Sequence, residues 1–140
     1  MEKWNEDCNI DITELAKEDI KTPQLHNKYL KILIGERAAL FKLKDKSKRV
    51  KRMLWQYYSG DLNDEPDTLK ELGREPMSRR ILKADVDTWI DSDTDMIDIL
   101  LQVSFQGEKV DYLESVLRMI NSRGWQIKNA IEWIKFQDGR

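Results

Sequence analysis

Apolar side chains recur at alternating steps of three and four residues between Met96 and Ile120. Such steps place the side chains on one face of an α-helix and are typical of long helices that pack against another helix. The repeat comprises Met96, Ile99, Val103, Gln106, Val110, Leu113, Leu117 and Ile120, of which only Gln106 is polar. The chain must therefore fold around at least one long, paired helix.

A second long helix is predicted over residues 23–58. Thr22 and Pro23 favour a helix start, because threonine caps free N–H groups and proline suits the first helical position. Ser59-Gly60 provides the stop. In between, apolar residues recur at a spacing close to heptads. They include Tyr29, Ile32, Ala39, Leu43, Val50, Met53 and Tyr57.

The other segments have weaker signals. Residues 1–21 are acidic, and we expect this end to fray. Residues 60–78 are predicted to form an acidic loop with one helical turn after Pro66. Residues 79–90 have apolar side chains too sparse for a helical stripe, so we expect an extended segment or short edge strand.

Four aspartates, Asp91, Asp93, Asp95 and Asp98, resemble a calcium-binding loop. An EF-hand loop requires glycine and glutamate where this chain has Met96 and Gln102. We therefore interpret the aspartates as the acidic start of a helix, where carboxylates complement the helix dipole.

The long helix is predicted to break at residues 121–124, before a final helix from Trp125 to about Gln137; together they span 94–137. The final helix is apolar around most of its circumference, which indicates a subunit interface. We expect that interface to contain Trp125, Ile127, Ala130, Ile131, Trp133, Ile134 and Phe136. The fold class is mainly α, with one domain over residues 22–140 that forms a homo-oligomer.

The segment from Lys42 to Arg52 holds seven cationic side chains in eleven residues, although the net charge of the chain is −2. Lysine and arginine gain affinity for a phosphate backbone by releasing its counterions, and aromatic rings next to them stack on unpaired bases. The helical spacing places these cations opposite the apolar face. The candidate contacts to single-stranded DNA are Lys44, Lys48, Arg49, Lys51, Arg52, Trp55 and Tyr58.

Other functions remain open on the sequence alone. The cationic segment could be only the solvated face of an oligomeric scaffold protein, or a contact to anionic lipid. A magnesium-dependent nuclease using Asp85, Asp87 and Asp91 is a third alternative. No phosphate-binding loop, nucleophile motif or metal-ligand pattern marks an active site, so we expect a protein without enzymatic activity, cofactor or metal.

The compartment is suggested by cysteine content and hydropathy. Cys8 is the only cysteine, which excludes an intrachain disulfide and suits a reducing cytosol. The N-terminal residues lack the apolar core of a signal peptide, and no run approaches the length needed to span a bilayer. We expect an intracellular protein that does not contact a membrane.

Three stretches carry a family resemblance. KRMLWQYYSG at residues 51–60, LKADVDTWIDSD at 82–93 and INSRGWQIKNAIEWIKF at 120–136 resemble the UvsY family of phage recombination mediators. The resemblance runs from about Asn27 to the end of the chain.

The resemblance implies a non-enzymatic accessory protein in the cytoplasm of the phage's host. Such a protein binds single-stranded DNA, contacts a RecA-type recombinase and a single-stranded DNA-binding protein, and helps the first replace the second. It also implies a ring of six or seven subunits, assembled through the C-terminal region. Arg52 matches a basic position of the family's DNA-binding motif, whereas Leu54 stands where that motif has a second basic residue.

Overall fold

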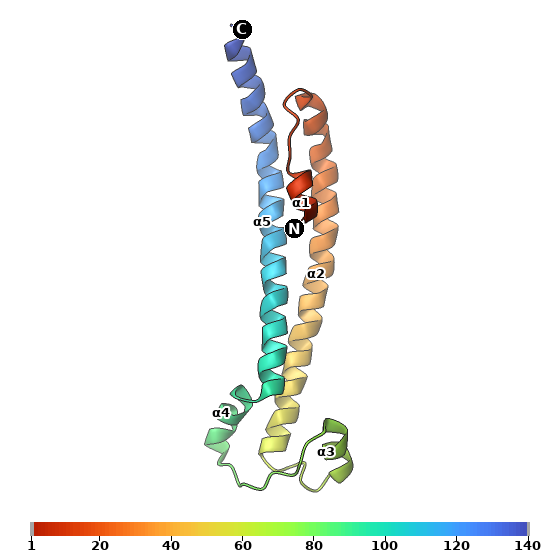
Figure 1. Cartoon of the computed structure of the whole chain (residues 1–140), viewed down its shortest axis with the longest axis vertical. Helices are drawn as coiled ribbons and strands as arrows, with labels where there is room; N and C mark the ends of the chain where they lie inside the picture. The colour runs from red at the N-terminus through yellow and green to blue at the C-terminus, as the bar shows by residue number, and fades with distance from the viewer. Residues whose placement is uncertain (1, 140) are drawn as a thin grey trace. The chain divides into compact units, whose positions relative to one another are not determined.

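The computed structural model describes residues 2–139 and confirms a mainly α fold (Figure 1). Within this range the chain forms helices and turns and has no β-strand. The elements in chain order are α1 (Glu2–Asp7), α2 (Leu15–Tyr58), α3 (Pro66–Leu72), the 3-10 helix η1 (Lys83–Asp85), α4 (Val86–Asp91) and α5 (Thr94–Gln137).

The strand expected near residues 79–90 was wrong, because this segment contains η1 and α4. Val86 and Ile90 are 1% and 0% exposed. Residues four apart lie on the same face of a helix, so two apolar side chains are enough to anchor this short helix to a core. The sequence analysis looked for a longer stripe than α4 needs.

Helix α2 begins at Leu15, earlier than the predicted start at Thr22 and Pro23, and Pro23 lies inside it. Proline removes one backbone hydrogen bond from a helix interior. Tertiary contacts hold the preceding turns, because Leu15 and Glu18 are both buried. The predicted stop is confirmed: α2 ends at Tyr58, and Gly60 adopts a φ of 86°, a conformation that glycine reaches without steric cost.

The predicted break at residues 121–124 was wrong, because α5 is continuous from Thr94 to Gln137. Ile120 and Ile127 lie on either side of the expected break and are 1% and 2% exposed. They extend the apolar repeat by one heptad, so packing carries the helix through Gly124 despite a propensity cost of about 1 kcal/mol.

The chain forms two compact units, and α2 and α5 contribute to both. The first unit joins the described residues up to Ala38 with those from Glu108 onward. Here the N-terminal part of α2 packs against the C-terminal part of α5, and α1 packs on α2 through an edge-to-face contact between Trp4 and Tyr29, whose ring centroids are 5.3 Å apart. Its core includes Tyr29, Leu33, Val116, Ile120 and Ile127.

The second unit spans residues 39–107 and contains α3, η1, α4 and the adjoining parts of α2 and α5. Its main apolar cluster consists of Leu54, Val86, Ile90, Met96 and Ile99. The helical turn expected after Pro66 is confirmed as α3, in which Pro66 occupies the first turn and Gly73 closes the C-terminus with a φ of 66°.

Candidate nucleic-acid interface

The C-terminal part of α2 has an apolar face fixed in the core of the second unit. Leu54 is fully buried, and Leu43, Val50 and Met53 pack against the same cluster. These positions follow helical spacing, so they hold one face of the helix inward and direct the remaining positions toward solvent.

The outward positions carry the predicted cations. Lys44, Lys48, Arg49, Lys51 and Arg52 are all exposed. Within residues 2–139, Arg49 is the one member of this set with an ion pair, at 3.1 Å from Asp45, and its side chain remains 81% exposed. The other four charges are uncompensated and can meet a polyanion without first breaking a protein contact.

The two predicted stacking residues differ in availability. Trp55 is 43% exposed. Tyr58 is partly buried, and its hydroxyl donates a hydrogen bond of 2.5 Å to the carboxylate of Asp93. Its ring also lies against Trp89, with centroids 5.8 Å apart. The structure therefore assigns Tyr58 a packing role and leaves Trp55 as the exposed ring of the predicted set.

A partly buried ionic cluster surrounds that hydroxyl. Arg74 donates two hydrogen bonds of 2.9 Å to Asp93 and one of 2.7 Å to Asp95, and its guanidinium lies 4.9 Å from the centre of the Tyr57 ring. Asp93 also accepts the backbone N–H of Asp95 at 2.9 Å, which caps α5 and confirms that Asp93, Asp95 and Asp98 mark a helix start, whereas Asp91 ends α4.

The same contacts shift three pKa values. Burial disfavours the charged form of Asp93, but hydrogen bonds from Arg74 and Tyr58 outweigh it and hold the pKa of this carboxyl below its usual value. The hydrogen bond to Asp93 raises the pKa of Arg74. Burial, followed by the bond to Asp93, raises the pKa of Tyr58. Arg74 and Asp93 are therefore charged at neutral pH while the Tyr58 phenol is neutral, and the cluster joins the 59–93 connection to the start of α5.

The residues predicted to form a subunit interface lie in the first unit and fall into two groups. Ile127 is 2% exposed and belongs to the core of the subunit, and Ala130 and Ile131 are partly buried. The others are exposed by 39–74%, namely Trp125, Trp133, Ile134 and Phe136. Trp133 and Phe136 stack on each other with centroids 5.7 Å apart, which leaves a compact aromatic surface in water.

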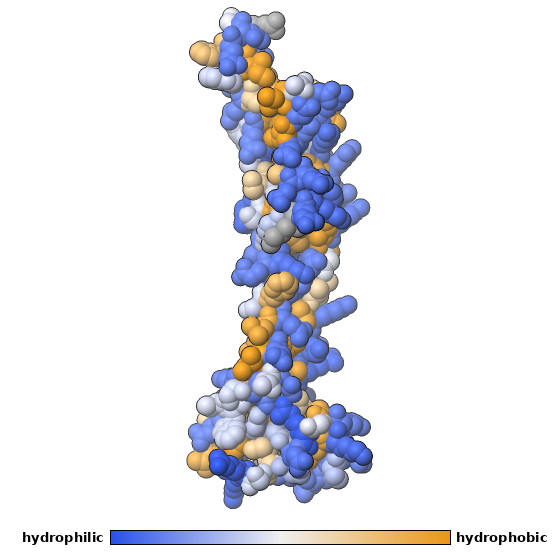
Figure 2. Space-filling view, viewed as in Figure 1, coloured by the Kyte–Doolittle hydropathy of each residue, from blue (hydrophilic) through white to orange (hydrophobic). Residues whose placement is uncertain are grey.

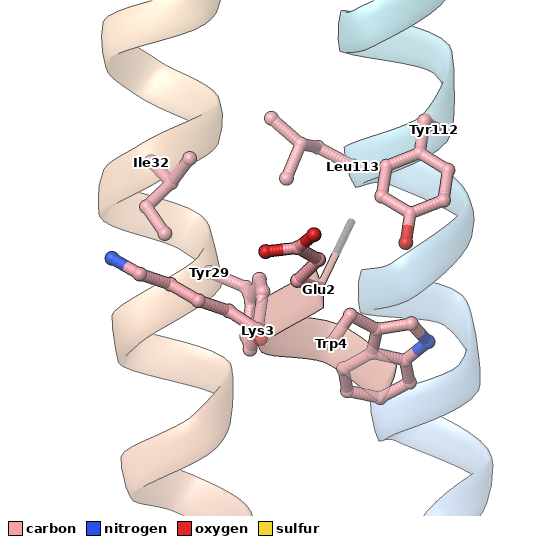
Figure 3. Close-up of a pocket in the computed structure, with 7 residues that line it drawn as sticks. All are labelled: Glu2, Lys3, Trp4, Tyr29, Ile32, Tyr112 and Leu113. Carbon is pink, nitrogen blue, oxygen red and sulfur yellow. The ribbon is translucent and has the colours of Figure 1, made fainter. Parts of the chain in front are cut away.

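The first unit also contains an open pocket of about 640 Å³ between α1, α2 and α5 (Figure 3). Figure 3 shows its mixed lining of Glu2, Lys3, Trp4, Tyr29, Ile32, Tyr112 and Leu113. This lining includes no serine, cysteine or histidine that would act as a nucleophile or base. Across residues 2–139, the structure gathers no group of three or more His, Cys, Asp or Glu side chains suited to a metal ion.

The family model described as "Recombination, repair and ssDNA binding protein UvsY" matches residues 3–140. The chain belongs to the UvsY family. Its role accordingly lies in recombination and repair. The UvsY family protein of Enterobacteria phage T4, "Recombination protein uvsY", is 24% identical over 140 residues, which cover 100% of this chain and 96% of that protein.

Crystal structures of the bacteriophage T4 recombination mediator protein UvsY have the same fold. One lattice form superposes with a TM-score of 0.81 at 24% identity, covering 97% of this chain and 96% of the crystallised one. A second gives a TM-score of 0.80, also at 24% identity, over 98% and 93%. In the part of this chain that the structure describes, no helix is long and apolar enough to cross a membrane.

Proposed function

We propose that this UvsY-family protein is a non-enzymatic mediator that binds single-stranded DNA. In this role it loads a RecA-type recombinase onto DNA covered by single-stranded DNA-binding protein. The process would serve phage recombination, repair and recombination-dependent replication in the host cytoplasm. The observation that carries the proposal is the exposed, unpaired charge of Lys44, Lys48, Lys51 and Arg52 on a helix whose opposite face is buried.

Several properties of this surface suit a flexible single strand. Each lysine or arginine that meets a phosphate releases condensed counterions, and this gain does not depend on base sequence. The exposed ring of Trp55 follows directly on the cations and offers a stacking surface for a base that is free of pairing. A duplex hides the faces of its bases and would leave this ring unused.

We infer further that six or seven copies assemble into a ring. The exposed aromatic surface of Trp125, Trp133 and Phe136 supports a subunit contact in the first unit. A second apolar strip lies on α5 in the second unit, where Ile97, Leu101 and Phe105 are exposed by 42%, 63% and 66% (Figure 2). Repeating the cationic face around a ring lets weak contacts of each subunit add up on one long strand.

The proposal is tested by titrating a labelled oligo-dT with protein at several salt concentrations while light scattering measures the mass of the protein. The parent should bind tightly at low salt, with affinity falling steeply as salt rises. In Lys48→Ala/Arg52→Ala, the slope of log affinity against log salt should decrease in magnitude by about 0.7 for each lost phosphate contact.

Lys31→Ala is the matched control, because Lys31 is an exposed lysine without an ion pair among the described residues, on the same helix but in the first unit. It should leave the slope unchanged. No binding by the parent at low salt would favour the scaffold alternative and overturn the DNA role. A monomeric mass for the parent would overturn the ring.

A further inference from the structure

We propose that Trp89, Arg79, Arg80 and Lys83 form a second contact surface for single-stranded DNA in the second unit. The inference rests on the DNA-binding role proposed above and extends it to a segment on the other side of the 59–78 connection. None of these four residues belongs to the cationic segment of α2.

The charge on this segment is available for binding. Arg79, Arg80 and Lys83 supply three cations within five residues, and all are exposed. Among residues 2–139, none of the three makes an ion pair. They therefore resemble the unpaired lysines of α2 in their electrostatic state, and they can release counterions from a phosphate backbone in the same way.

The segment is held in place by its apolar member. Ile81 packs against the cluster that contains Leu54, Val86 and Ile90. Leu82 has extended backbone angles, with φ −64° and ψ 141°. Ile81 is partly buried against this cluster, whereas its neighbour Arg80 is exposed. This packing attaches the cationic segment to the core cluster that contains Leu54. In the sequence of α2, Leu54 lies between Arg52 and Trp55, two of the candidate DNA contacts.

Trp89 supplies a ring that follows these cations in sequence and lies in the same unit. It is 37% exposed, and its contact with Tyr58 holds one part of the indole. Val86 and Ile90 hold a neighbouring face of α4 in the core. Tyr58 is partly buried and its hydroxyl is bound to Asp93, so Trp89 is the more exposed ring of this pair. A ring already fixed by packing loses little conformational freedom when a base stacks on it.

The acidic neighbours of Trp89 determine the kind of strand that fits. Asp85, Asp87 and Asp91 are exposed on η1 and α4, and their carboxylates repel phosphate from this helix. Binding near α4 must therefore occur through a base, with the phosphates closer to Arg79, Arg80 and Lys83. Only a single strand can turn an unpaired base toward Trp89 while its backbone follows the cations.

Trp89→Leu tests this surface, because leucine keeps apolar packing on Tyr58 but removes the stacking ring. We expect its affinity for labelled oligo-dT to fall at least about fivefold, in line with the loss of one stacked base. Its affinity for an oligomer of abasic sites of equal length should not change. Trp89→Phe should restore binding of oligo-dT to near the parent value. Leu82→Ala is the control, because it alters an exposed apolar residue of the same segment without touching a ring or a charge.

The cations are tested separately by Arg79→Gln/Arg80→Gln/Lys83→Gln, which should reduce the magnitude of the salt slope for oligo-dT and for the abasic oligomer alike. Circular dichroism confirms that each variant is folded. If Trp89→Leu and the triple variant both bind like the parent while Lys48→Ala/Arg52→Ala binds weakly, the second surface is excluded and the proposed function stands. If the parent itself does not bind oligo-dT, the proposed function fails and this surface fails with it.

Discussion

The two parts of α2 carry similar cations in different electrostatic surroundings. In the first unit, Lys17, Lys21, Lys28 and Arg37 each form an ion pair, with Glu14, Glu18, Asp7 and Glu114 respectively. In the second unit, the described residues provide an ion-pair partner for only Arg49 of the seven cations from Lys42 to Arg52. One helix thus has charges that hold the fold together and charges that are available to a ligand.

Some of the paired charges of the first unit connect elements that are distant in sequence. Asp7 accepts hydrogen bonds from Lys28 and from the hydroxyl of Tyr29, and these two bonds hold its pKa below the usual value. They attach α1 to α2. Arg123 and Glu18 form a buried ion pair between α5 and α2. These partners give Lys28 and Arg123 a structural role in the first unit, whereas most cations from Lys42 to Arg52 lack such a partner among the described residues.

The largest predicted effect concerns the ion pair of Arg123, whose side chain is 4% exposed. Arg123→Met should lower Tm by about 10 °C or more, because the buried carboxylate of Glu18 then keeps only the exposed Lys21 of its two ion-pair partners. Glu18→Leu/Arg123→Met should recover most of this loss, since it removes both charges and fills the space with apolar atoms. Calorimetry at a fixed protein concentration measures both variants.

Binding of oligo-dT below the transition should be the same in Arg123→Met as in the parent. A weaker salt slope in this variant would contradict the separation between structural and available charges. If the double variant melted as low as the single one, the ion pair would have a stabilising role that burial of charge does not explain.

A smaller effect is expected for Asp93, the anchor of the paired cluster within the second unit. Asp93→Asn should lower Tm at neutral pH by about 5 °C or more, because charge-assisted hydrogen bonds from Arg74 are lost. The pKa of Asp93 in the folded chain lies below its ordinary value of 3.8, so its stabilising effect is fully present above pH 3.8 and is lost as pH falls through the folded-state value.

Thermal melts between pH 2 and 7 would test this sign. The difference in Tm between the parent and Asp93→Asn should shrink as the solution is acidified below about pH 4. A difference that stays constant down to the lowest pH would show that Asp93 stabilises the fold through packing rather than through its charge.

Much of the fold could be predicted because the signals are local. The apolar repeats determine α2 and α5, and the spacing of cations places them on the solvent face of α2. The end of α2 follows from Ser59-Gly60, and α3 from Pro66 and Gly73. These features depend on residues within a turn or two of one another, where propensity and periodicity are informative.

The wrong predictions concern segments whose structure depends on contacts between residues that are far apart in the sequence. Local propensity favours a break at Gly124, but Ile120 and Ile127 are buried on either side of it, and neighbouring Arg123 pairs with Glu18 near the other end of the chain. Leu54 stands where the family's DNA-binding motif has a second basic residue. In this chain it belongs to the main apolar cluster of the second unit.

Within the candidate site, the surroundings of Tyr58 also depend on distant residues. Tyr58 was predicted to stack on bases, yet Asp93 holds its hydroxyl and Trp89 covers part of its ring. No spacing rule relates residue 58 to residue 89, because a connection with its own helices separates them. The exposure of Trp89 could not be foreseen once residues 79–90 were expected to form an extended segment or short edge strand.

The smallest predicted effect tests whether DNA binding depends on the number of cations on α2 or on their lack of ion-pair partners. Ser47→Glu adds a carboxylate four residues before Lys51, the favourable orientation for an ion pair on a helix, and should stabilise α2 by a few tenths of a kcal/mol. It removes no cation, yet it should reduce the magnitude of the salt slope for oligo-dT by up to about 0.7, since one lysine no longer faces the strand alone. Ser47→Gln controls for size.

Asp45→Asn should shift the slope in the opposite direction, because it frees Arg49 from its ion pair. If Ser47→Glu bound as the parent does, unpaired charge would not be the property that distinguishes the two parts of α2.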